Sequence, residues 1–94
     1  MIKHVVMWKF KPGTQEQARQ FIDGLRGLYG VIPQIKEQEV GLDCGVAGNY
    51  SGVLVSAFDS MEDLEAYKKD PRHVAVSSLC KAIREDRVCV DYII

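Results

Sequence analysis

The sequence lacks the paired cysteine spacings that mark disulfide frameworks and zinc fingers. Its cysteines, Cys44, Cys80 and Cys89, are odd in number and show no C-x-x-C spacing, which favours reduced thiols. The 2 histidines come from separate predicted elements without ligand-like spacing. No phosphate loop, nucleotide fingerprint or hydrolase elbow occurs. We therefore expect neither a metal ion nor a cofactor.

Charge of one sign and long apolar runs are also scarce. The 12 basic and 13 acidic residues are scattered along the chain, so no basic stripe indicates a nucleic-acid partner. No apolar run has the length of a membrane helix, and no signal peptide precedes the first predicted strand. These absences predict a soluble cytoplasmic protein with no nucleic-acid or membrane partner.

The chain does have enough apolar residues for one core. With 94 residues, 47% of them apolar, it predicts a single domain over residues 1–94. Alternating or continuously apolar patterns indicate four strands: residues 2–11, 35–42, 51–58 and 87–94. Helical spacing indicates three helices: residues 14–29, residues 60–69, and a third that begins at residue 70.

Side chains at two of the predicted helix starts support these assignments. Thr14 is followed three residues later by Gln17, and Ser60 by Asp63. Both pairs resemble capping boxes, in which the first side chain accepts a hydrogen bond from a free backbone N–H of the first turn. We expect a helix to begin after Thr14 and another after Ser60.

The order strand, helix, strand, strand, helix, strand describes two split β-α-β units. It predicts an α+β, ferredoxin-like fold: a four-stranded antiparallel sheet with helices on one face. Residues 2–11, 51–58 and 87–94 are apolar on both faces, so the second face of the sheet needs another cover. The simplest cover is the same face of a second copy, and we expect a homodimer.

The best candidates for chemistry are Tyr67 and His73. Asp70 and Pro71 form a helix start, which places His73 in the first turn of the new helix. The helix dipole disfavours a positive charge there, so we expect a neutral imidazole that can act as a base. A chain reversal could bring the Tyr67 phenol into the same cavity. The alternative is that Tyr67 packs and His73 binds a backbone carbonyl.

Five short motifs extend over nearly the whole chain: His4-Val-Val-Met-Trp-Lys-Phe-Lys-Pro-Gly13, Ile32-Pro-Gln-Ile35, Phe58-Asp-Ser-Met-Glu-Asp-Leu-Glu-Ala-Tyr67, Asp70-Pro-Arg-His-Val74 and Val90-Asp-Tyr92. Their order and spacing resemble the stress-responsive dimeric α/β barrel family, often called Dabb. The resemblance implies the ferredoxin-like unit described above, paired so that two sheets form a barrel. It does not imply one activity, because a fold does not fix a function.

Within that family, the resemblance to a plant polyketide cyclase implies three catalytic candidates: Tyr67, His73 and His4. His73 would take an α-proton from a ketone while Tyr67 holds the carbonyl or enolate oxygen. Four residues are expected to line the pocket: Val6, Trp8, Ile22 and Arg84. Arg84 stands where that enzyme has an aromatic side chain, which favours a smaller or more polar ligand.

Three functions remain open from the sequence. The first is a homodimer of unassigned role that binds a small molecule between sheet and helices near Tyr67 and His73. The second is a cyclase, isomerase or lyase that uses His73 as general base. The third is a stress-protective oligomer without catalysis. A cavity beside Tyr67 and His73 would favour the first two over the third.

Overall fold

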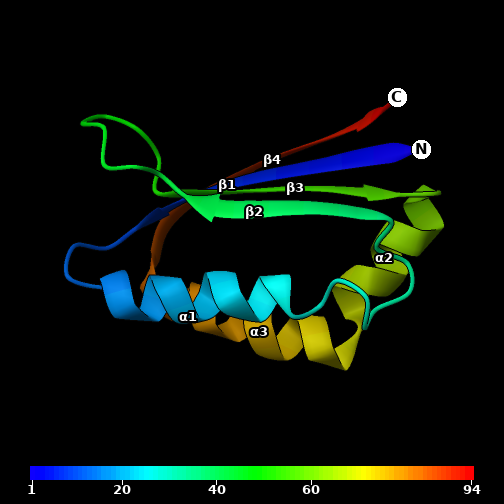
Figure 1. Cartoon of the computed structure of the whole chain (residues 1–94), viewed down its shortest axis with the longest axis horizontal. Coiled ribbons are helices and arrows are strands. Elements are labelled where there is room, and N and C mark those ends of the chain that lie inside the picture. Colours follow the sequence, from blue (N-terminus) through cyan, green and yellow to red (C-terminus); the bar gives the residue numbers. More distant parts are fainter.

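The computed structural model describes all residues from Met1 to Ile94. The elements follow in this order: β1 (Ile2–Phe10), α1 (Gln15–Arg26), β2 (Glu37–Leu42), β3 (Gly52–Phe58), α2 (Met61–Lys69), α3 (Pro71–Ile83) and β4 (Arg84–Ile93). The strands form one antiparallel sheet in the order β2-β3-β1-β4, and the helices lie together on one of its faces (Figure 1). This arrangement confirms the predicted α+β, ferredoxin-like fold. None of the helices is long and apolar enough to cross a membrane.

Strand β1 carries the alternation that positions the core. Ile2, His4, Val6 and Trp8 are buried and share one face of the strand, as its period of two requires. A cluster of 14 buried residues from the sheet, the helices and the connection after α1 fills the space between the sheet and the helices. β1 and β3 are the central strands, and β2 and β4 are the edge strands.

The opposite face of the sheet is apolar and has no helix over it. Neighbouring residues of β3, β1 and β4 form this surface, which we call the open sheet face: Val5, Met7, Val53, Val55, Val88 and Val90. Val90 is 56% exposed and Met7 is 41% exposed. A contiguous apolar surface of this kind marks an interaction site on most proteins.

Two element boundaries differ most from the sequence prediction. α1 ends at Arg26 rather than near Tyr29, because the chain tightens after Gly27 into turns in which the N–H of Leu28 bonds the Leu25 carbonyl. β4 begins at Arg84 rather than Arg87. An irregularity in the β1–β4 pairing beyond Lys9 brings Arg84 opposite Phe10 and extends the strand to the end of α3.

The two predicted capping boxes behave differently. Ser60 is extended, and its hydroxyl accepts a hydrogen bond of 3.1 Å from the N–H of Asp63. Thr14 has φ −110° and ψ 25° and makes no side-chain cap. Its hydroxyl instead donates to the carbonyl of Lys11 at 2.6 Å. The prediction of a cap at Thr14 is therefore wrong, because the preceding turn uses that hydroxyl.

Replacing Ser60 by alanine is expected to lower the free energy of unfolding by about 1 kcal/mol, since the N–H of Asp63 loses its acceptor. The matched control is Thr14→Ala, which removes no cap and should cost less. Urea unfolding of both variants measures the difference. Equal losses at the two positions would contradict this account of the helix starts.

Candidate functional site

A small cavity lies between the sheet and the helices. Its volume is about 50 Å³. Its apolar wall comes from β1, α1 and β3: Val6, Trp8, Phe21, Leu25 and Leu54. Its remaining lining is polar or titratable: His4, Tyr67, His73, Ser77, Cys80, Arg84 and Arg87. A larger open depression of about 460 Å³ beside the loop between β2 and β3 contains no histidine. The histidines therefore gather at the smaller cavity.

Tyr67 and His73 meet at this cavity from two successive helices. The Asp70 side chain accepts a hydrogen bond from the N–H of Arg72 and begins α3, which turns His73 back toward Tyr67. The two ring centroids are 4.3 Å apart. Tyr67 is only 2% exposed, and burial raises the pKa of its phenol to about 12. Its hydroxyl is thus a proton donor at neutral pH, and no protein atom accepts from it.

His73 is half-buried, with one ring nitrogen already bonded. Its Nδ1 lies 3.1 Å from the carbonyl oxygen of Lys68, so Nδ1 carries a proton and donates it. Burial lowers the pKa of His73, and the bond to Lys68 opposes that shift. In the neutral ring, Nε2 is left with a free lone pair. The hydrogen bond to a backbone carbonyl that a structural role would require is therefore present. It uses only Nδ1, so Nε2 remains available as a base.

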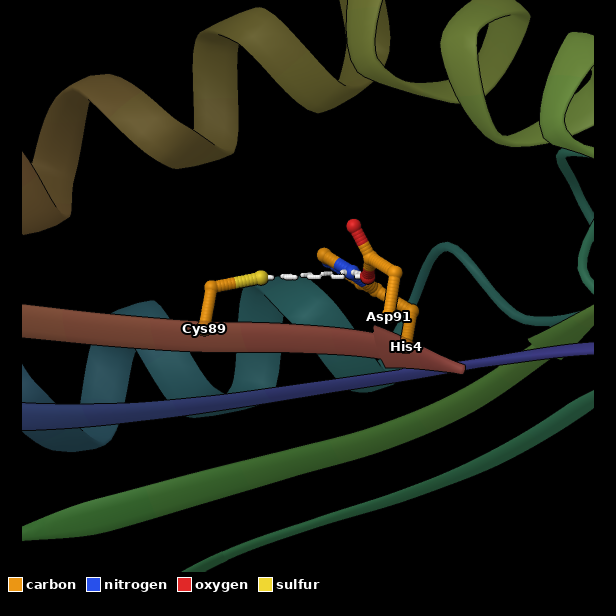
Figure 2. A group of neighbouring side chains, drawn as sticks. All are labelled: His4, Cys89 and Asp91. Carbon is orange, nitrogen blue, oxygen red and sulfur yellow. Dashed lines mark hydrogen bonds and ion pairs between the residues drawn. The ribbon is translucent and has the colours of Figure 1, made fainter. Parts of the chain in front are cut away.

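His4 is the second histidine of the cavity and is 3% exposed. Its Nδ1 lies 2.5 Å from Oδ1 of Asp91, the residue directly opposite on β4. Burial lowers the pKa of His4, while the Asp91 carboxylate raises it. Cys89 lies beside this pair, with its Sγ 3.7 Å from Nδ1 of His4 (Figure 2). His4 therefore has a carboxylate and a thiol on the same side of its ring.

Arg84 and Arg87 give the cavity a positive charge. Arg84 caps the end of α3 and Arg87 follows on β4. Neither forms a salt bridge, and no aspartate or glutamate lines the cavity. The charge of Arg87 also lowers the pKa of His73 and acts in the same direction on His4. An anionic group would find two unpaired cations here.

The Dabb family model, described as the Stress responsive A/B Barrel Domain, matches residues 2–94. The chain belongs to the Dabb family. A stress-response A/B barrel domain-containing protein of Arabidopsis thaliana, DABB1, is 30% identical over 99% of this chain, which spans 47% of the length of that relative. Olivetolic acid cyclase from Cannabis sativa is 26% identical over 97% of this chain and 94% of its own length.

Solved structures of similar shape agree with the Dabb assignment. A dimeric protein of unknown function from Bacteroides fragilis has a TM-score of 0.89 and 30% identity over 99% of this chain and 95% of its own. A dimeric ferredoxin-like protein from Thermobifida fusca also has a TM-score of 0.89, at 30% identity over 99% of this chain and 90% of its own. A hydroxynitrile lyase from Passiflora edulis has a TM-score of 0.84, at 25% identity over 99% of this chain and 92% of its own.

In this Dabb chain, Tyr67 and His73 line the cavity. Of the five other residues expected there from the sequence, four also line it: His4, Val6, Trp8 and Arg84. Ile22 does not line it. Ile22 is buried in the core, while its helix neighbours Phe21 and Leu25 face the cavity. Sequence reasoning missed Arg87 and the pairing of Asp91 with His4. The alternation of β4 carried a signal for both, since Arg87 and Asp91 share the strand face opposite Val88.

Proposed function

We propose that this Dabb protein is a homodimer that binds a small oxygen-bearing molecule in the cavity between Tyr67 and His73. The observation that carries the proposal is the Tyr67 hydroxyl, which donates to no protein atom although its residue lines the cavity and is only 2% exposed. No fully buried side-chain oxygen or nitrogen lacks a hydrogen-bond partner, so this hydroxyl keeps some contact with solvent at the cavity. A ligand oxygen beside it would accept this free hydroxyl proton in place of solvent.

The charges around the cavity favour a ligand with a carboxylate. Arg84 and Arg87 are unpaired, and a charge-assisted hydrogen bond is roughly twice as strong as a neutral one. The volume of about 50 Å³ is far below the roughly 300 Å³ of common drug-sized pockets, so the ligand is small. Arg87 is exposed and Arg84 is half-buried, so both side chains are free to move outward as it enters. A short-chain keto acid meets these conditions.

The second candidate function is general base catalysis on such a ligand. It is favoured by the bond between His73 Nδ1 and the Lys68 carbonyl, which fixes the tautomer with a basic Nε2. Nε2 would take the α-proton, and the Tyr67 hydroxyl would donate to the developing enolate oxygen. The relatives named as a cyclase and as a lyase support an enzymatic role for this chain. If no carbonyl compound reacts, the function that remains is that of a stress-protective oligomer without catalysis.

The open sheet face supports the homodimer. It is apolar and has no helix over it (Figure 1), and two similar solved structures are dimeric. Burial of apolar surface contributes about 25 cal/mol per Å², so joining two such faces stabilises both copies. The cavity lies on the other side of the sheet, and each subunit would keep its own.

Acetoacetate is a suitable probe of the proposed binding, and its ethyl ester is the uncharged control. We expect NMR shifts of residues around the cavity with acetoacetate, and binding at least about tenfold weaker, or about 1.4 kcal/mol, in Arg87→Gln. Arg19→Gln is the matched control, because Arg19 is exposed on α1 and does not line the cavity. Equal binding of acid and ester, or shifts confined to other surfaces, would contradict the proposal.

A further inference from the structure

Three side chains that can bind a metal ion meet at the edge of the cavity. His4 comes from β1, and Cys89 and Asp91 are alternate residues on β4, so the β1–β4 pairing places all three on one face of the sheet. Their ligand atoms lie within 4.8 Å of one another. Figure 2 shows the Cys89 thiol and the Asp91 carboxylate both directed toward the imidazole ring of His4.

Two of the three separations already match those of a tetrahedral zinc site. With a Zn–S bond of about 2.3 Å and Zn–N and Zn–O bonds of about 2.0–2.1 Å, tetrahedral angles place sulfur about 3.6 Å from each lighter ligand. The Cys89 Sγ lies 3.7 Å from Nδ1 of His4 and 3.8 Å from Oδ1 of Asp91. The sulfur is thus at the required distance from both.

The third separation is shorter than a metal would need. Nδ1 of His4 and Oδ1 of Asp91 are 2.5 Å apart, as in a hydrogen bond, whereas two ligands of one zinc ion are about 3.4 Å apart. The Asp91 side chain is 24% exposed and lies on an edge strand, so it has room to move back by that amount. His4 is 3% exposed and is held by the core.

We propose that His4, Cys89 and Asp91 form a binding site for a zinc-type divalent transition-metal ion, with one coordination position left open. A thiolate, an imidazole and a carboxylate are ligands that zinc accepts together, whereas magnesium and calcium take oxygen ligands. Three protein ligands and an open fourth position are typical of zinc sites that hold water or a small molecule. This site does not depend on the ligand proposed for the cavity.

Binding of the ion requires a change of protonation at two ligands. The Cys89 thiol gives up its proton to solvent, so about one proton is released per ion. The proton on Nδ1 of His4 is replaced by the metal, and in a neutral ring it moves to Nε2. His4 would then offer a donor instead of an acceptor on its other nitrogen. The ion therefore alters the hydrogen-bonding character of the cavity as well as filling a site.

Cobalt(II) is the probe, because it replaces zinc in such sites and its thiolate complexes absorb strongly in the near ultraviolet. Titration of the reduced full chain is expected to give a thiolate-to-cobalt band that saturates at one ion per chain. Added zinc should displace it. Cys89→Ser should abolish the band and weaken zinc binding at least about tenfold, since even changes beyond the direct ligands cost about 10- to 100-fold.

The control is Cys44→Ser, which removes an exposed thiol from the loop between β2 and β3 and should leave the band intact. Cys89 is exposed too, so its replacement by serine should fold normally, which circular dichroism checks. Asp91→Ala provides a second test of the same site and should also weaken zinc binding. A missing band, or a band that persists in Cys89→Ser, would overturn the proposal while leaving acetoacetate binding to be judged separately.

Discussion

Replacing Val55 by aspartate is expected to abolish the folded dimer. Val55 belongs to the open sheet face and lies on the central strand β3, between Val5 of β1 and Glu39 of the edge strand β2. In a dimer the new carboxylate would be buried without a partner, which costs several kcal/mol. That is a large part of the total stability of about 5–15 kcal/mol that a protein of this kind has. We expect an unfolded or aggregated chain rather than a stable monomer.

Sedimentation and thermal melts measure this outcome. The matched control is Val46→Asp, which introduces the same charge at an exposed loop residue away from the sheet and should behave like the unmodified chain. A folded monomer of the unmodified chain at micromolar concentration would rule out the obligate dimer. A stable, monomeric Val55→Asp variant would show that the face is an optional interface.

Replacing His73 by asparagine is expected to abolish proton transfer while keeping the fold. The asparagine amide can still donate to the Lys68 carbonyl, as Nδ1 of His73 does, but it cannot act as a base. Loss of a general base typically slows a reaction by about 10²- to 10⁴-fold. Exchange of the α-protons of acetoacetate with deuterated solvent, followed by NMR, measures this loss.

The comparison with His73→Ala separates the chemical role from the structural one. Alanine also leaves the Lys68 carbonyl without its donor, which should lower the free energy of unfolding by about 1–3 kcal/mol relative to asparagine. If His73→Asn and His73→Ala lower the free energy of unfolding equally, the hydrogen bond to the Lys68 carbonyl does not contribute to stability. If proton exchange is unchanged in His73→Asn, His73 is not the base.

The pH dependence of stability follows from the direction of the His73 pKa. Burial lowers this pKa below its ordinary value, helped by the charges of His4 and Arg87 and opposed by the Lys68 carbonyl and Asp70. The unfolded chain therefore binds the proton more readily, so His73 favours folding above pH about 6.5 and this contribution is lost as pH falls below it. His73→Asn should reduce the dependence of the free energy of unfolding on pH in this range. An NMR titration that finds the pKa of His73 at or above about 6.5 would count against its role as a general base.

The fold could be predicted from the sequence because its signals are local. The alternating pattern of β1 predicts one face that contains Ile2, His4, Val6 and Trp8, and these residues form the buried face of the strand. Asp70 and Pro71 marked the start of α3, which is also observed. The helix does begin after Thr14, but the side-chain cap predicted there was wrong, because its hydroxyl has two competing partners and the choice between them depends on the turn at Gly13, whose φ is 79°.

The composition of the cavity could not be predicted in full, because it depends on contacts between residues far apart in the sequence. His4 and Asp91 are 87 positions apart, and only the register of β1 against β4 brings them together. Ile22 shows the same limit on a smaller scale. Helical spacing correctly buries it, but which part of the buried stripe faces a cavity depends on how α1 is rotated against the sheet.

The chain ends of β1 and β4 lie side by side, and the N–H of Ile94 donates to the Met1 carbonyl at 3.0 Å (Figure 1). The pairing of these two strands is therefore the contact between the most distant parts of the chain, and it closes the largest loop during folding. Joining the ends by a short turn and opening the chain between β2 and β3 would convert that pairing into a local hairpin. Because folding rates rise as contacts become more local, such a rearranged chain should assemble the strands that carry His4 and Asp91 early in folding.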